Sequence, residues 1–137
     1  MIIVDDRLTL ELLAGRHVSA VSDDDAVATT WGFHYRLARA LAAPVSGGQL
    51  SGGVPARQLL DTVLSPRPGG VEVLDPRAIT REAVAAAARH GLNLLAAELV
   101  GAARHHEATI ALSAANVGRS WPAVFEAEGI ELRVVTR

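Results

Sequence analysis

The sequence predicts an α/β domain, a three-layer α/β/α sandwich with a mainly parallel sheet. Short apolar segments that are typical of strands alternate with longer segments whose apolar residues recur at helical spacing. The strand segments are apolar along most of their length, as in strands that are buried on both faces. About half of the 137 residues are apolar, which is enough for one compact core. We therefore expect a single domain over residues 1–137.

The first residues have the pattern of a strand followed by a helix. Ile2 to Val4 form the predicted strand, and Asp6 can cap a helix that runs to about Leu13, with Gly15 ending it. The segment from His17 to Val21 fits either a short strand or a loop. The chain therefore begins with a β-α unit.

A run of three aspartates, residues 23–25, predicts the start of a long helix that ends near Leu41, because negative charge is favourable at a helix N-terminus. The expected buried face repeats at helical spacing and consists of Ala26, Thr30, Phe33, Leu37 and Leu41. Trp31 and Tyr35 lie beside this face. They would serve core or subunit packing, and an exposed cluster of such aromatics would indicate an interface.

Two glycine pairs between Pro44 and Val54 predict a loop. A phosphate-binding loop would need a preceding strand and a following lysine, and the sequence offers neither. A pocket lined by residues 47–53 would instead favour small-molecule binding at the sheet edge. The next predicted elements are a short helix and a strand, at Pro55 to Leu64 and at Val71 to Leu74.

The second half of the chain predicts two long helices, a strand, a short helix and a final strand. Thr80 is the expected cap of the first helix, Gly91 its end, and Ser120 the cap of the short helix. The predicted ranges are Thr80 to His90, Asn93 to His105, Thr109 to Leu112, a short helix after Ser120, and Ile130 to Val135.

Composition excludes several kinds of chemistry. The chain has no cysteine, so disulfides, thiolate zinc sites and cysteine nucleophiles are excluded. All thirteen basic residues are arginine, which excludes a catalytic or phosphate-binding lysine. The net charge of −2 gives no general attraction to a polyanion. No signal segment or membrane span is evident, and we expect a cytoplasmic protein with no membrane contact.

Asp5 is the strongest candidate site residue, with Asp6 beside it. It follows a predicted parallel strand directly, and open α/β sheets bind ligands at the carboxyl ends of their strands. Asp5 could bind a divalent cation, or it could accept hydrogen bonds from the amides of the following helix. The histidine pair at residues 105 and 106 followed by Glu107 fits a solvated helix end better than a metal site.

The order of the elements resembles the PIN domain, the fold of VapC-type toxins and related endoribonucleases. The segments that carry the resemblance are Ile2-Ile3-Val4-Asp5, Gly91-Leu92-Asn93-Leu94-Leu95-Ala96-Ala97, Ala108-Thr109-Ile110-Ala111-Leu112-Ser113 and Gly129-Ile130-Glu131-Leu132-Arg133-Val134-Val135. Active members of that family gather three or four carboxylates around Mg²⁺ or Mn²⁺. Such an ion binds a phosphate oxygen and helps to activate the attacking water.

The resemblance implies four acidic positions. Only the first of them is clearly filled, by Asp5. No acid occupies the region of residues 29–34, where the second is expected. The third position falls on Ala96. Glu98 is close by, but two residues along a helix rotate a side chain by roughly 200°. The last acid, expected after the penultimate strand, falls on Ala114 and Asn116.

The sequence therefore predicts a PIN-like domain with a degenerate acidic centre. The first hypothesis is a non-catalytic module that binds protein or RNA, forms a homo-oligomer or pairs with an antitoxin-like partner, and needs no cofactor. The alternative is an active VapC-type endoribonuclease that depends on Mg²⁺ or Mn²⁺. For that case the candidate catalytic residues are Asp5, Asp6 and Glu98, aided by one of Asp23 to Asp25, with Asp5 as the metal ligand.

Overall fold

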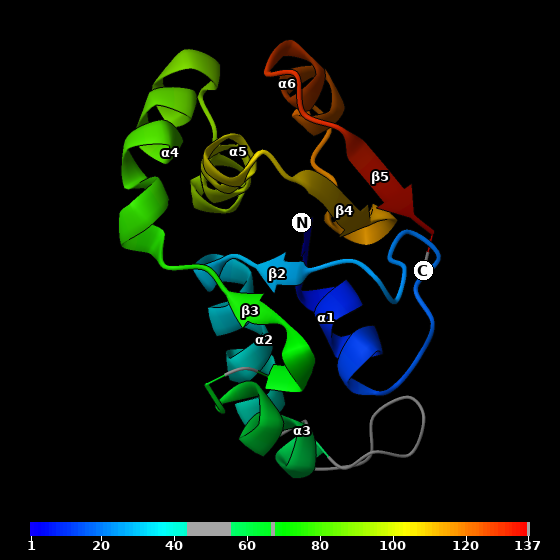
Figure 1. Ribbon diagram of the computed structural model, residues 1–137. Coiled ribbons are helices and arrows are strands. Elements are labelled where there is room, and N and C mark those ends of the chain that lie inside the picture. The colour runs from blue at the N-terminus through cyan, green and yellow to red at the C-terminus, as the bar shows by residue number, and fades with distance from the viewer. Residues whose placement is uncertain (44–55, 67, 137) are drawn as a thin grey trace.

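The computed structural model describes residues 1–43, 56–66 and 68–136. Within these ranges, five parallel strands form one sheet in the order β3-β2-β1-β4-β5. Helices pack against both faces of this sheet (Figure 1). The predicted α/β sandwich is confirmed, and every strand pair is parallel. The two glycine pairs of residues 47–53 lie outside the described residues.

The N-terminal half follows the predicted β-α start. Its elements are β1 (Ile2–Val4), α1 (Asp6–Leu13), β2 (Val27–Thr29), α2 (Trp31–Ala42) and α3 (Ala56–Val63). Asp5, rather than Asp6, caps α1 by accepting a hydrogen bond from the Leu8 amide. The segment from His17 to Val21 contains no strand.

The predicted start of the long helix at the aspartate run is wrong, whereas its predicted end near Leu41 is close to the end of α2 at Ala42. Asp23 and Asp24 are exposed in a turn, where the Asp25 carboxylate accepts from the Ser22 amide. The residues after this turn form β2, and α2 begins only after Thr30. A strand can form here because β1 and β3 offer pairing on both sides, and this long-range pairing overrides the local preference for a charged helix start.

The C-terminal half contains β3 (Glu72–Val73), α4 (Pro76–His90), α5 (Leu94–His106), β4 (Thr109–Ser113), α6 (Trp121–Ala127) and β5 (Leu132–Val135). Two single-turn 3-10 helices, η2 (Pro68–Gly70) and η3 (Ala114–Asn116), precede β3 and α6.

Two further predicted helix caps, both in the C-terminal half, are wrong. Asp75 caps α4 through the Arg77 amide, whereas Thr80 lies inside the helix and donates its hydroxyl hydrogen bond to the Pro76 carbonyl. Proline at the first helical position explains the earlier start, because its missing N–H needs no partner there. Ser120 precedes α6 but makes no side-chain cap. Gly91 ends α4 with a positive φ of 67°, as predicted.

Alternating residues of the central strand divide the core between the two faces of the sheet. Ile3 packs with α4, α5 and α6 through residues such as Leu99 and Phe125. Ile2 and Val4 face the opposite side and pack with α1 and the loop after it. Among the described residues, no helix is long and apolar enough to span a bilayer.

One buried carboxylate, Glu128, joins α4 and α5 to the end of α6. Arg89 and Arg104 each approach it to 2.6 Å, and His90 Nε2 lies at 2.8 Å. Only 5% of the Glu128 side chain is exposed. Burial alone would raise the pKa of Glu128, but the hydrogen bonds from Arg89, His90 and Arg104 outweigh it and lower this pKa from 4.5 to about 2.

We expect this carboxylate to make the fold sensitive to acid. Because the pKa of Glu128 is lower in the folded state, its contribution is present above pH 4.5 and is lost as the pH falls towards about 2. Allowing for solvent screening at the exposed arginines, the loss between pH 7 and pH 3 is about 1–2 kcal/mol. Urea unfolding of wild type and Glu128→Gln at both pH values measures it. Equal acid sensitivity of the two proteins would contradict the assignment.

Candidate functional site

The strand order places a topological switch point at the carboxyl ends of β1 and β4. From β1 the chain continues to β2 on one side, whereas β4 pairs with the other side of β1. Connections leave in opposite directions at such a point, and the resulting crevice is where open α/β sheets bind ligands. Asp5 follows β1 and Ser113 ends β4, so both lie at this position.

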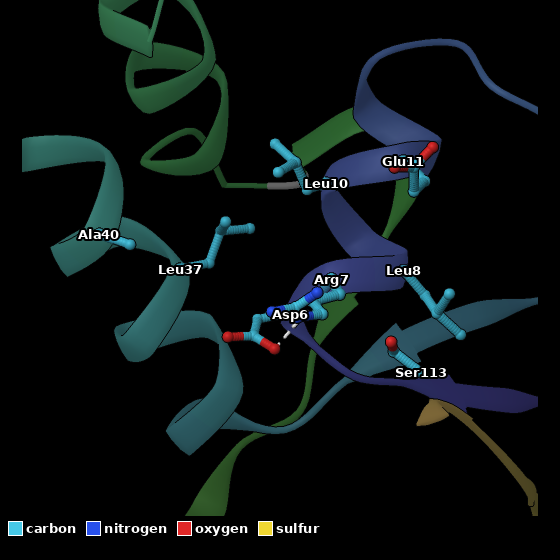
Figure 2. A pocket seen from close by; sticks show the side chains of 8 residues that line it. All are labelled: Asp6, Arg7, Leu8, Leu10, Glu11, Leu37, Ala40 and Ser113. Carbon is cyan, nitrogen blue, oxygen red and sulfur yellow. Dashed lines mark hydrogen bonds between the residues drawn. The ribbon is translucent and has the colours of Figure 1, made fainter. Parts of the chain in front are cut away.

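A cleft of about 280 Å³ opens between α1 and α2 beside this switch point. Figure 2 shows Leu10 of α1 and Leu37 of α2 pointing into the space between the helices, with Asp6 at one end. The other lining residues are Arg7, Leu8, Glu11, Ala40 and Ser113. The candidate site is therefore a polar cluster at the end of a largely apolar cleft.

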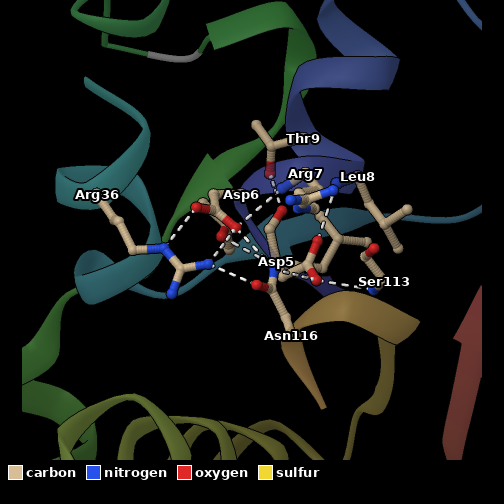
Figure 3. Close-up of polar contacts among 10 residues, drawn as sticks. Asp5, Asp6, Arg7, Leu8, Thr9, Arg36, Ser113 and Asn116 are labelled. Atoms are coloured by element: carbon tan, nitrogen blue, oxygen red, sulfur yellow. Dashed lines mark hydrogen bonds and ion pairs between the residues drawn. The ribbon is translucent and has the colours of Figure 1, made fainter. Parts of the chain in front are cut away.

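Asp5 is fully buried and serves as an acceptor for three protein donors (Figure 3). One carboxylate oxygen, Oδ1, accepts from the Leu8 amide at 2.9 Å. The other, Oδ2, accepts from the Ser113 amide at 2.7 Å and from Asn116 Nδ2 at 2.8 Å. The Asp5 carboxylate thus joins the start of α1 to the end of β4 and to η3.

Burial is the main influence on the charge of Asp5. It raises the pKa of this carboxyl above 3.8, although the hydrogen bonds from Leu8, Asn116 and Ser113 act in the opposite direction. The neighbouring Asp6 carboxylate adds to the increase by charge repulsion.

Asp6 is neutralised by an arginine from α2. Arg36 Nε lies 2.7 Å from Asp6 Oδ2, and Arg36 Nη2 lies 3.1 Å from Oδ1. This two-point contact matches the planar guanidinium to the carboxylate, which is the strongest geometry for such a pair. The Asp6 side chain is 12% exposed, whereas that of Arg36 is 44% exposed. The arginine therefore covers the acid from the solvent side.

Asn116 connects the two aspartates through its amide. Its Nδ2 donates to Asp5 Oδ2 and, at 2.9 Å, to Asp6 Oδ1. Its Oδ1 accepts from Arg36 Nη2 at 2.6 Å. A carboxylate at this position could not donate to both acids, so the amide holds the pair together without adding charge.

Glu98 has a separate role at the start of α2. Its Oε1 accepts from the Gly32 amide at 2.9 Å, and its side chain is largely buried in α5. Thr30 occupies the cap position of α2, but its hydroxyl oxygen is buried without a partner. Glu98 therefore supplies from α5 the acceptor that Thr30 does not. Burial raises the pKa of Glu98, partly offset by the Gly32 hydrogen bond.

The candidate acids do not form a multi-carboxylate centre. All Asp, Glu and His side chains of the sequence fall within the described residues, and there no three of them come close enough to share a metal ion. Ala96 is buried in the core, Ala114 is exposed, and Asp23 to Asp25 lie in their turn. Of the candidate acids, Asp5 and Asp6 alone are brought together, and Asn116 lies beside them where the resemblance implies the last acid.

Sequence reasoning identified Asp5, Asp6 and the uncharged Asn116, but it missed the role of Arg36. A usable signal was present. Residue 116 has lost the expected negative charge, and Arg36 lies on the helix that follows β2, the neighbour of β1 in the sheet. Placing this arginine opposite Asp6 required the true start of α2 at Trp31, which the aspartate run concealed.

The fold and the site together define an α/β domain whose sheet-edge aspartates are satisfied by the protein itself. No protein-family model matches the chain, and no curated protein matches it either.

Proposed function

We propose that this chain is a PIN-like domain with a degenerate acidic centre that acts as a non-catalytic binding module for a protein partner. The observation that carries the proposal is the Arg36 guanidinium bound to Asp6 and Asn116, where a catalytic cation would need access. The PIN-like part rests on the order of elements and on the position of Asp5.

The charge balance of the site supports this proposal. A divalent cation in a nuclease is held by several negative oxygen ligands. Here the Asp6 carboxylate is paired with the Arg36 guanidinium, and Asp5 already accepts three hydrogen bonds. A cation would have to displace Arg36 or these donors, and it would gain no third carboxylate among the described residues.

Exposed aromatic side chains on α2 support a protein partner. Trp31 and Tyr35 stack with a ring-centroid distance of 5.3 Å and an interplanar angle of 14°. They remain 45% and 53% exposed, whereas Phe33 on the same helix is fully buried. Tyrosine and tryptophan are enriched in protein interfaces, where they provide large contact area at low entropic cost. A foreign protein or a second copy of the chain could use this pair.

The direct test combines metal titration with RNA cleavage. We expect no saturable Mg²⁺ or Mn²⁺ binding below millimolar concentration by calorimetry, and no cleavage of a mixed-sequence RNA above the level of Asp5→Asn. The asparagine variant keeps the shape of the side chain and removes the charge that a nuclease needs. Tight Mn²⁺ binding with RNA cleavage that disappears in Asp5→Asn would overturn the proposal in favour of an active endoribonuclease.

A further inference from the structure

A second concave surface lies between α4 and α5. It is a groove of about 300 Å³ whose lining includes Ile79, Ala83, Val84, Leu94, Ala97 and Glu98. Val84 and Leu94 are 63% and 67% exposed, which is high for residues of this type. The two helices that form the groove lie side by side on one face of the sheet (Figure 1).

Small residues let α4 and α5 approach each other closely beside the groove. A Cβ placed on Gly101 would meet the Ala83 amide nitrogen at 2.8 Å and the Ile79 carbonyl oxygen at 3.0 Å. This close approach of the backbones draws the helices together at Gly101. The larger side chains of Val84, from α4, and Leu94, from the start of α5, line the groove.

Glu98 places a carboxylate in this apolar surface. Only 5% of the residue is exposed, and Oε1 is used by the Gly32 amide. The second carboxylate oxygen, Oε2, has no hydrogen-bond partner among the described residues. It is not completely buried, because in the described part of the chain Thr30 Oγ1 is the one fully buried side-chain oxygen or nitrogen without a partner. A carboxylate in apolar surroundings is stabilised best by a positively charged donor.

We propose that the α4–α5 groove binds an apolar segment of a partner protein that directs one arginine or lysine side chain to Glu98. Val84 and Leu94 would contact the apolar residues of that segment, and the free oxygen of Glu98 would accept from the cation. Charge complementarity selects this occupant over a purely apolar one, which would leave the carboxylate without a partner. The inference deepens the proposed function by naming the chemistry of the partner.

The probe is a capped amphipathic model peptide with leucines and one central arginine on one face and glutamines on the other. Its matched control carries citrulline, the uncharged analogue of arginine. Calorimetry should show about tenfold or tighter binding of the arginine peptide to the wild-type protein, as a hydrogen bond to a charged group provides. The amide signals of Gly32 and Leu94 should shift in two-dimensional NMR spectra, because the Gly32 amide lies 2.9 Å from Glu98.

Two variants locate the effect. Glu98→Gln can still accept from Gly32, and it should bind both peptides with equal affinity. Leu94→Gln changes an exposed residue and should weaken the binding of both peptides several-fold.

Equal affinities of the two peptides for the wild-type protein would overturn the proposal, as would a preference for arginine that persists in Glu98→Gln. Sedimentation showing a dimer that Leu94→Gln dissociates would also overturn it, because a second copy would then fill the groove. RNA cleavage would refute the non-catalytic function and leave these peptide results unaffected, so the two failures are distinguishable.

Discussion

Replacement of Asp5 with alanine is expected to destabilise the fold by about 3–5 kcal/mol, because it removes one acceptor shared by three donors. The Leu8 and Ser113 amides and the Asn116 side chain would all lose this partner at a fully buried position. Urea unfolding measures the loss.

Asp5→Asn separates hydrogen bonding from the space that the side chain fills. The carbonyl oxygen of asparagine can replace one carboxylate oxygen, but its NH₂ group would face a hydrogen-bond donor and could not accept from it. We therefore expect the free energy of unfolding to fall by a smaller amount, about 1–2 kcal/mol. Asp24→Ala, in an exposed turn, is the matched control and should change stability little. A destabilisation by Asp5→Ala no larger than that of Asp24→Ala would show that Asp5 does not hold β1 and β4 together.

Replacement of Arg36 with methionine is expected to convert the surroundings of Asp6 and Asn116 into a weak cation site. The change removes the positive charge that contacts Asp6 and frees Asn116 Oδ1. The carboxylate oxygens of Asp6 and the amide oxygen of Asn116 are ligands that Mn²⁺ accepts. Loss of a neighbouring positive charge should raise the Mn²⁺ affinity by roughly tenfold or more. Paramagnetic broadening of the Asp6 and Asn116 NMR signals during a Mn²⁺ titration measures it.

Arg39→Met provides the control for Arg36→Met, because it removes the same charge from an exposed position on the same helix. It should leave the Mn²⁺ affinity unchanged. Equal gains in the two variants would mean that only the general field of α2 repels the cation. No gain in either variant would show that Asp6 and Asn116 cannot form a cation site even when Arg36 is removed.

The parts of the fold that depend on local apolar pattern could be predicted from the sequence. The strand at Ile2–Val4 and helix α5 appear close to their predicted positions. The strand β2 could not be predicted. It is only three residues long, and its weak strand pattern was outweighed by the helix start that the preceding aspartate run predicts. Its pairing with β1 and β3 decides the outcome, and such long-range contacts are not readable from a local window.

In the candidate site too, the sequence predicts what depends on local pattern and does not predict the long-range contacts. Asp5 was predictable, since a residue that directly follows a buried parallel strand has a known location. The ion pair of Arg36 with Asp6 joins residues that are 30 apart, and the Glu98 contact with Gly32 joins residues that are 66 apart. Predicting either contact required the position of α2 relative to the sheet. That position could not be derived, because the predicted start of the helix was wrong.

The order of strands also affects how the chain is made. β1 precedes the other described strands along the chain, but it lies at the centre of the sheet, and one of its neighbours is β4. The hydrogen bond between the Ser113 amide and Asp5 spans 108 residues. During translation, one edge of β1 therefore stays unpaired until the much later β4 has been synthesised. Contacts of such long sequence separation slow folding and expose the nascent strand to aggregation.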